Sequence, residues 1–203
     1  HGGGGDGFGC DINRADATKM LGSLYYDQFE KSTNGGTSFS SACTGLAECN
    51  DSTNAPFITV LSPWAGDATG NTLFTYSNFK AYKSVNYATS WTALGTTGLP
   101  ASGSIFIRGI GAAKTSVNTV GLVANSGRAF LTTNGGTSWT QIGSTASLPG
   151  NGLSLSSIAF DPTNASIIYI ASVAPSLTAN HLWRSIDSGA TWTVRKTALG
   201  TVV

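Results

Sequence analysis

Residues 32–39, "STNGGTSF", decide how this sequence folds. Two adjacent glycines stand among small polar residues, and an aromatic residue closes the run. Three interpretations are open: a phosphate-binding loop, a flexible linker, or a tight turn between two β-strands. A phosphate loop requires a lysine and a following helix, and the stretch has neither. The rest of the sequence favours the turn.

The same pattern occurs three more times along the chain. It returns as "SVNYATSW" at 84–91, "TTNGGTSW" at 132–139 and "SIDSGATW" at 185–192. The first positions of successive copies are 52, 48 and 53 residues apart. A repeat of about fifty residues is typical of one blade of a β-propeller. The neighbourhood repeats too, since the position two residues before each copy holds Glu30, Tyr82, Phe130 and Trp183.

Each repeat is expected to form four short antiparallel strands, because apolar runs alternate with polar turn residues. The predicted strands are 7–12, 19–25, 27–32, 38–43, 56–63, 72–77, 79–85, 90–94, 104–111, 118–124, 127–133, 138–142, 155–160, 167–173, 181–186 and 191–196. The sequence therefore predicts an all-β chain of four propeller blades, at about 1–50, 51–100, 101–150 and 151–203. These blades form a whole propeller or part of a larger one.

Turn chemistry explains the residues of each copy. Glycine reaches positive φ without steric cost, as a tight connection between the third and fourth strands requires. The third position can accept backbone N–H bonds across the turn, and it holds Asn34, Asn86, Asn134 and Asp187. The closing aromatic residue is expected to be buried between neighbouring sheets. It is Phe39, Trp91, Trp139 and Trp192 in the four copies. All eight side chains are therefore predicted to be structural.

The form S-x-D-x-G-x-T-W resembles the Asp-box, or bacterial neuraminidase repeat. The copy at 185–192 matches it best; the first three copies carry Asn in place of Asp, and the second has Ala88 where glycine is usual. Because four copies cover nearly the whole chain, the resemblance implies an Asp-box β-propeller with the box at the blade periphery, away from any functional site. This superfamily includes sialidases, xyloglucanases, sortilin-type receptors and a photosystem assembly factor, so the fold does not select a function.

Composition narrows the class of protein. Only 10% of the 203 residues are charged, Gly occurs 26 times, and the formal net charge is +1. This neutral polar composition is typical of an extracellular or cell-surface β-protein, and it gives no electrostatic footprint for nucleic acid. No apolar run reaches the roughly 20 residues that span a bilayer, so we expect no membrane insertion. The abrupt start and end of the chain predict an excerpt of a longer protein.

The cysteines and histidines are few. Cys43 and Cys49 bracket "TGLAE", a loop that a local disulfide could close; free thiols are the alternative. Cys10 would then remain unpaired. Because His1 and His181 are the only histidines, no metal cluster of His, Cys and carboxylates can be assembled at ligand spacing. We therefore expect no metal and no cofactor.

The residues that could carry chemistry are also few. A glycoside hydrolase needs two carboxylates about 5 to 10 Å apart, yet no Asp or Glu occurs from 68 to 160. Asp6, in "GGGGDGFG", is the one catalytic candidate, because its glycine neighbours let a ligand approach; the alternative is a turn that Asp6 caps. Arg108, in "FIRG", could face a central channel as a binding residue, or be a solvated arginine. Trp64, in "SPWAG", could stack on a sugar or a partner, or lie in the core.

Three functions remain open. We expect an extracellular, non-catalytic scaffold or binding module that engages protein or glycan through a loop face, with apolar end faces buried in a homo-oligomer or larger assembly. The alternative is a xyloglucanase-like glycoside hydrolase whose second carboxylate lies outside this segment. A third is a receptor or assembly factor that binds a peptide in the central channel.

Overall fold

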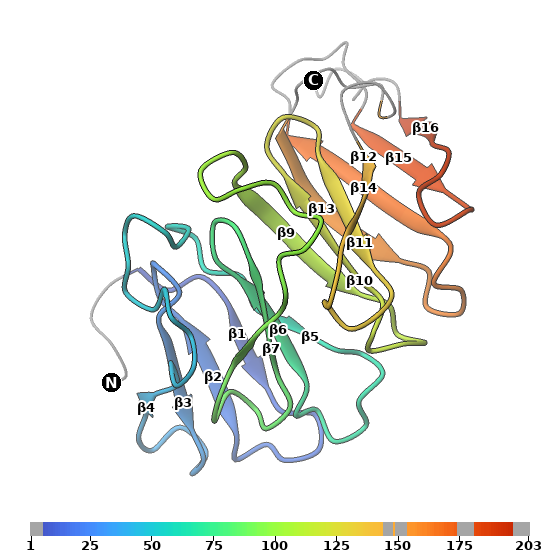
Figure 1. Ribbon diagram of the computed structural model, residues 1–203. Coiled ribbons are helices and arrows are strands. Elements are labelled where there is room, and N and C mark those ends of the chain that lie inside the picture. The colour runs from blue at the N-terminus through green and yellow to red at the C-terminus, as the bar shows by residue number, and fades with distance from the viewer. Residues whose placement is uncertain (1–5, 144–147, 149–153, 174–180, 197–203) are drawn as a thin grey trace, which may run out of the picture. The chain divides into compact units, whose positions relative to one another are not determined.

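The computed structural model of the chain describes residues 6–143, 148, 154–173 and 181–196 (Figure 1). These residues form sixteen β-strands. Within the described part of the chain there is no helix of the length and apolar character that a membrane crossing requires. The chain is all-β, as the sequence predicts.

The strands form four antiparallel sheets, each built from four strands that follow one another in sequence. The first sheet contains β1 (Cys10–Ile12), β2 (Met20–Ser23), β3 (Phe29–Ser32) and β4 (Ser40–Ser41). The second contains β5 (Ser62–Pro63), β6 (Leu73–Tyr76), β7 (Ala81–Ser84) and β8 (Thr92–Ala93). The third contains β9 (Ile107–Ala112), β10 (Val120–Ala124), β11 (Ala129–Thr132) and β12 (Thr140–Gly143). The fourth contains β13 (Ser154–Phe160), β14 (Ile168–Val173), β15 (Leu182–Ser185) and β16 (Thr193–Lys196). Each sheet corresponds to one predicted repeat, so this part of the prediction is confirmed.

The second sheet differs from its prediction in its first strand. The predicted strand 56–63 is reduced to the two residues of β5. The start of that segment bonds elsewhere, because the Pro56 carbonyl accepts the Tyr26 amide of the β2–β3 turn (3.2 Å). Its backbone is therefore held by the first sheet and does not pair with β6.

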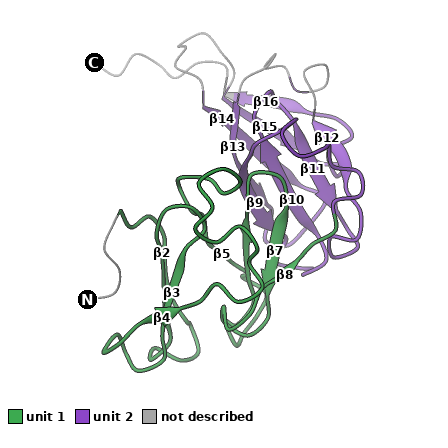
Figure 2. Ribbon diagram, turned by 60° about the vertical axis from the view of Figure 1, so that its left-hand side comes forward, with its two compact units in different colours: residues 1–95 green, residues 96–203 purple. Residues whose placement is uncertain are grey.

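The four sheets lie in two compact units, residues 1–95 and residues 96–203 (Figure 2). Each unit has a hydrophobic core to which both of its sheets contribute. The core of the first unit includes Leu21, Phe29, Leu73, Tyr82 and Trp91. The core of the second unit includes Leu131, Ile142, Ile158, Ile170 and Trp183. Burial of these apolar side chains is the main favourable contribution that holds the two sheets of a unit together.

The four repeated turns share one hydrogen-bond network. The hydroxyl at the first position donates to the side-chain oxygen at the third position and accepts the backbone amide at the fifth. In the fourth turn these bonds join Ser185 Oγ to Asp187 Oδ1 and Gly189 N to Ser185 Oγ (2.7 Å each). The Thr191 hydroxyl and amide also donate to Asp187, and they lower the pKa of its carboxyl to about 2. Asn34, Asn86 and Asn134 accept the amide of the seventh position in the same way.

Two closing tryptophans, Trp91 and Trp192, connect the two sheets of their unit. Trp91 and Trp139 are buried, and Trp192 is half-buried. The indole N–H of Trp91 donates to the Ala42 carbonyl, just after β4, and that of Trp192 donates to the Ile142 carbonyl in β12 (2.8 Å each). In each unit the tryptophan of the second turn, Trp91 or Trp192, therefore anchors that turn to the preceding sheet.

Phe39 does not follow this pattern. It is 38% exposed, so the expectation that it is buried is wrong. The second sheet covers the face of the first sheet that carries Leu21 and Phe29, and within the first unit the Phe39 face is left open. A hollow of about 370 Å³ on this open face is lined by Phe8, Cys10, Gly22, Glu30 and Phe39, among others.

Two glycines allow a loop to pass very close to a closing tryptophan. Gly45 has a φ of 81°, and a Cβ atom there would lie 2.1 Å from the Trp91 carbonyl oxygen. Gly98, with a φ of 88°, stands in the same relation to Trp139, at 1.9 Å. Because no side chain fits at these distances, glycine is required at both positions.

Candidate functional site

Four aromatic side chains gather at one end of the first sheet. Phe8 precedes β1, Tyr25 and Tyr26 belong to the β2–β3 turn, and Phe57 lies in the loop between β4 and β5. The Phe57 ring centroid is 5.5 Å from those of Phe8 and Tyr26, edge to face, and 6.1 Å from that of Tyr25, with the two rings nearly parallel. Both arrangements are favourable for aromatic rings. We call these four residues the aromatic cluster.

The aromatic cluster is open to solvent. Phe8 is 37% exposed and Phe57 is 49% exposed, while the two tyrosines are half-buried. The next residue, Ile58, is exposed as well. Rings that fix one another in place and remain accessible on one side form an apolar surface suited to a sugar ring or an apolar protein side chain.

Backbone hydrogen bonds fix the turn that carries the tyrosines. Tyr26 and Asp27 both have positive φ, 54° and 56°, which is the geometry of a tight two-residue hairpin turn. The Tyr26 carbonyl accepts the Asn50 amide (2.7 Å), and the Asp27 amide donates to the Thr59 hydroxyl (2.8 Å). The turn and the loop between β4 and β5 therefore hold each other in position.

A disulfide closes the first part of the same loop. It joins Cys43 to Cys49, the pair that the sequence singles out. Cys10 is a free, exposed thiol in β1. The loop that presents Phe57 is thus constrained covalently as well as by hydrogen bonds.

Two buried carboxylates, Asp27 and Glu48, lie in this turn and loop. Glu48 accepts the Tyr82 hydroxyl and forms an ion pair with Lys80 Nζ (2.7 Å). Neither carboxyl oxygen of Asp27 has a hydrogen-bond partner among the described residues. Burial and the negative charge of Glu48 raise the pKa of Asp27 to about 8, so this carboxyl is mostly protonated at neutral pH.

Three half-buried aspartates hold turns. Asp16, Asp67 and Asp161 each accept the hydroxyl of the threonine two positions later, at 2.6 to 2.7 Å. For Asp16 and Asp161 these bonds, together with bonds from the threonine amides, lower the pKa of the carboxyl. The hydrogen bonds within the turns are therefore a sufficient structural role for all three aspartates.

The three candidates from the sequence lie on different elements. Asp6 is exposed in the segment before β1, two residues from Phe8. Trp64 is half-buried in the β5–β6 turn, at the opposite end of the first unit, where its carbonyl accepts a bond from Arg14 (3.2 Å). Arg108 is exposed in β9 of the second unit, beside a hollow of about 320 Å³. Asp6 and Trp64 therefore do not share a site.

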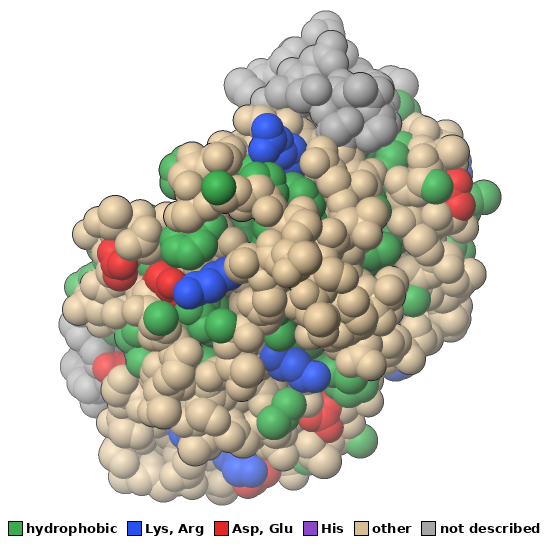
Figure 3. All heavy atoms as spheres, in the orientation of Figure 1, with side chains coloured by type: hydrophobic (Ala, Val, Ile, Leu, Met, Phe, Trp, Pro, Cys, Tyr) green, Lys and Arg blue, Asp and Glu red, His purple; other side chains and the backbone are tan. Residues whose placement is uncertain are grey.

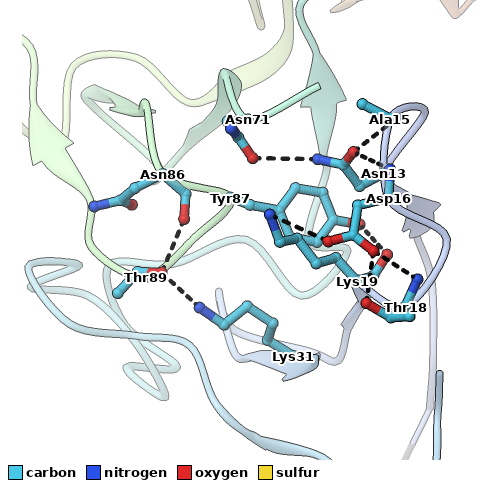
Figure 4. Close-up of polar contacts among 10 residues, drawn as sticks. All are labelled: Asn13, Ala15, Asp16, Thr18, Lys19, Lys31, Asn71, Asn86, Tyr87 and Thr89. Carbon is cyan, nitrogen blue, oxygen red and sulfur yellow. Dashed lines mark hydrogen bonds and ion pairs between the residues drawn. The ribbon is translucent and has the colours of Figure 1, made fainter. Parts of the chain in front are cut away.

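A polar hollow lies at that opposite end of the first unit, where the first sheet meets the second repeated turn (Figure 4). We call it the seam groove. Its volume is about 280 Å³, and its lining includes Lys19, Lys31, Thr33, Asn71 and Thr89. Lys31 donates to the Thr89 hydroxyl (2.7 Å), and Lys19 pairs with Asp16 (3.5 Å).

Tyr87 closes the inner side of the seam groove. It occupies the turn position that Gly35 and Gly135 hold in the first and third copies, with a φ of 53°. Its side chain is buried, and its hydroxyl lies within hydrogen-bond distance of the Asp11 and Lys19 carbonyls (3.1 Å each). The second turn is therefore attached to the first sheet through this side chain.

The rest of the surface carries few charges. Figure 3 shows acidic and basic side chains as small, separate groups among neutral atoms on the face in view. In the ranges that the structure describes, no three His, Cys, Asp or Glu side chains gather as a metal ion would require.

Known proteins resemble this chain in structure. No family model matches it, and no curated protein matches it in sequence. The GH74 xyloglucanase from Xanthomonas campestris superposes on 91% of this chain with a TM-score of 0.67 and 16% identity. YCF48 from Cyanidioschyzon merolae does so over 97%, with a TM-score of 0.61 and 16% identity. The extracellular domain of a one-component system from B. thetaiotaomicron covers 92%, with a TM-score of 0.59 and 10% identity. These proteins are β-propellers.

This chain has a β-propeller fold. It spans 29% of the length of the Xanthomonas enzyme, 57% of YCF48 and 23% of the extracellular domain. At 10 to 16% identity, the likeness concerns the propeller fold alone.

Sequence reasoning missed both the aromatic cluster and the seam groove. Tyr25, Tyr26 and Phe57 stand outside the repeated turns, where comparison of the copies gives no guide. One signal could have found them: two adjacent tyrosines occupy a hairpin turn, where small polar residues and glycine are usual. The seam groove depends on contacts between two repeats, which spacing along the chain does not reveal.

Proposed function

We propose that this chain is part of an extracellular Asp-box propeller that acts as a non-catalytic scaffold or binding module, engaging protein or glycan through the aromatic cluster. The observation that carries the proposal is the exposure of Phe8 and Phe57 within four mutually packed rings. The shared network of the four turns supports the Asp-box assignment. A structural relative that is an extracellular domain supports the location. The open face of the first sheet would be covered in an assembly or by a further blade.

The placement of the two buried carboxylates, Asp27 and Glu48, supports a non-catalytic role. Glu48 is already bound by Lys80 and Tyr82, and Asp27 is fully buried. A substrate at the aromatic surface reaches neither carboxylate without a rearrangement of the loop that holds them.

The GH74 relatives favour a second candidate, a xyloglucanase-like hydrolase. In that case Asp6, exposed two residues before Phe8, is the candidate acid, and its partner carboxylate lies outside this segment. Trp64 and Arg108 would then serve as binding residues, one in each unit. A glycosidase needs two carboxylates across one bond, so this candidate requires more chain than is present here.

Titration calorimetry with xyloglucan oligosaccharides, combined with a reducing-end assay of the same mixture, separates the two candidates. We expect binding without release of reducing ends. The double substitution Tyr25→Ala and Phe57→Ala should weaken binding about tenfold or more, because it removes the stacking surface. Phe106→Ala is the matched control, because it removes a ring that is 40% exposed in the other unit and should leave affinity unchanged.

Two results would change the conclusion. Release of reducing ends that Asp6→Asn abolishes would establish the hydrolase. Unchanged affinity in the double variant would show that the aromatic cluster is not the binding surface. A chain that binds neither these oligosaccharides nor a broad glycan array would restrict the proposal to a protein ligand.

A further inference from the structure

The seam groove brings two lysines to one side of a cavity of about 280 Å³ (Figure 4). Lys31 lies in β3 and pairs with Leu21 of β2. Lys19 stands two residues before Leu21, and because side chains alternate along a strand, both lysines belong to the same face of the first sheet. The second repeated turn supplies Thr89 to the same groove.

Only one of the two lysines has an ion-pair partner among the described residues. Lys31 Nζ donates to the Thr89 hydroxyl, which is a neutral partner. Burial and the charge of Lys19 lower the pKa of the Lys31 ammonium. Of the carboxylates in the described ranges, Asp16 alone forms an ion pair with either lysine, 3.5 Å from Lys19 Nζ, and it already accepts the Thr18 hydroxyl. The Asp11 carboxyl lies on the same face, since Asp11 also pairs with Leu21, but it interacts with the Tyr87 hydroxyl and forms no ion pair with either lysine.

The other copies of the repeat satisfy the corresponding position differently. Lys83 lies over the Phe74 ring at 5.9 Å, and Arg184 lies over the Tyr169 ring at 5.9 Å. The third copy has an uncharged residue, Leu131. An ammonium held beside a second ammonium is thus particular to the first repeat. The residue at this repeat position needs no charge to form the turn, because the third copy has Leu131 there and forms the same turn.

Neutral donors complete the groove. Asn71 Oδ1 accepts a bond from Asn13 Nδ2 (3.3 Å), so the amide N–H groups of Asn71 are left to donate. We propose that the seam groove binds an oxyanion, the sulfate, phosphate or carboxylate group of an anionic ligand, between Lys19 and Lys31. Charge-assisted hydrogen bonds from the two ammonium groups would hold it and relieve their mutual repulsion. This site lies at the opposite end of the first sheet from the aromatic cluster and does not depend on the proposed function.

Nuclear magnetic resonance titration of the labelled chain with sodium sulfate and with sodium phosphate tests the proposal, with sodium chloride of equal ionic strength as the reference. We expect saturable shifts at the amides of Lys31, Asn71 and Thr89. Lys31→Met keeps the aliphatic stem, removes the charge, and should weaken binding at least about fivefold. Lys83→Met is the matched control, because it removes a lysine from the same repeat position and should change nothing.

Equal shifts in chloride, or unchanged sulfate binding by a folded Lys31→Met variant, would overturn the proposal. A melting curve of that variant shows that it is folded, and Lys19→Met provides a second test of the same charge. A heparin-derived disaccharide and glucose 6-phosphate then distinguish the source: whichever binds more tightly, with loss in Lys31→Met, identifies a sulfated or a phosphorylated ligand. Phe57→Ala should leave these titrations unchanged, so this proposal and that of the aromatic cluster can fail separately.

Discussion

At the scale of single residues, Asp27 links the stability of the first unit to pH. An aspartate in an unfolded chain titrates near pH 4, whereas burial and the charge of Glu48 raise the folded pKa of Asp27 to about 8. Between these values the folded protein holds a proton that the unfolded chain has lost. The free energy of unfolding should therefore fall as pH rises from about 4 to about 8, by up to about 1.4 kcal/mol per pH unit. The stability that protonated Asp27 contributes at low pH is lost above that range.

The substitution Asp27→Asn should remove this dependence. The amide is similar in shape, remains neutral at every pH, and tolerates the positive φ of the turn. Urea unfolding at pH 5, 6.5 and 8 should show the stability of the variant rising relative to that of the natural chain as pH rises, with the smallest difference at pH 5, where the natural chain has lost least of this contribution. If the free energies of unfolding of the two proteins change in parallel with pH, then the pKa of Asp27 does not differ between the folded and unfolded states as described.

At the scale of elements, the connection between sheets depends on backbone approach as much as on side chains. Gly45 and Gly35 both have positive φ, 81° and 69°, but a Cβ atom at Gly35 would meet nothing within 4 Å, while one at Gly45 would meet the Trp91 carbonyl. Gly35→Ala should therefore destabilise the chain by about 1 to 2 kcal/mol, from the backbone conformation alone.

Gly45→Ala adds a steric clash to that conformational cost. The loop or the tryptophan must move, and the bond from the Trp91 amide to the Thr44 carbonyl is strained or lost. We expect a decrease in the free energy of unfolding at least about 1 kcal/mol larger than for Gly35→Ala. Denaturant unfolding of the two variants measures this difference, and equal losses would mean that the close approach contributes nothing.

The elements also show what could be read from the sequence. All sixteen strands fall within or next to their predicted ranges, because each copy of the turn fixes the position of the strands around it. The segment 56–63 is the main failure, since its apolar residues are used to reach the β2–β3 turn of another sheet. Phe39 fails for a related reason: its residue type indicates burial, but burial depends on whether a second sheet covers that face. Local pattern predicts strands well, and it does not predict which loops carry a binding surface.

At the scale of the whole molecule, all three cysteines lie in the first of the two units. The disulfide between Cys43 and Cys49 closes a short loop, and in the chain-entropy model such a cross-link stabilises by about 2 kcal/mol. Reduction should therefore speed hydrogen exchange of the slowest amides of the first unit about 30-fold and leave those of the second unchanged. A Cys43→Ser, Cys49→Ser variant should reproduce the fast exchange without reductant. Equal acceleration in both units would show that they open together.

Repeat proteins can be lengthened or shuffled when any copy fits any neighbour. Tyr87 removes that freedom from the first two copies, because its ring fills a socket in the first sheet and its hydroxyl meets two carbonyls there. The third and fourth turns carry Gly135 and Ser188 at this position, and neither would fill the socket. The second repeat therefore packs specifically against the first. A residue of a turn that only reverses the chain in the other copies thus fixes the order of these two repeats.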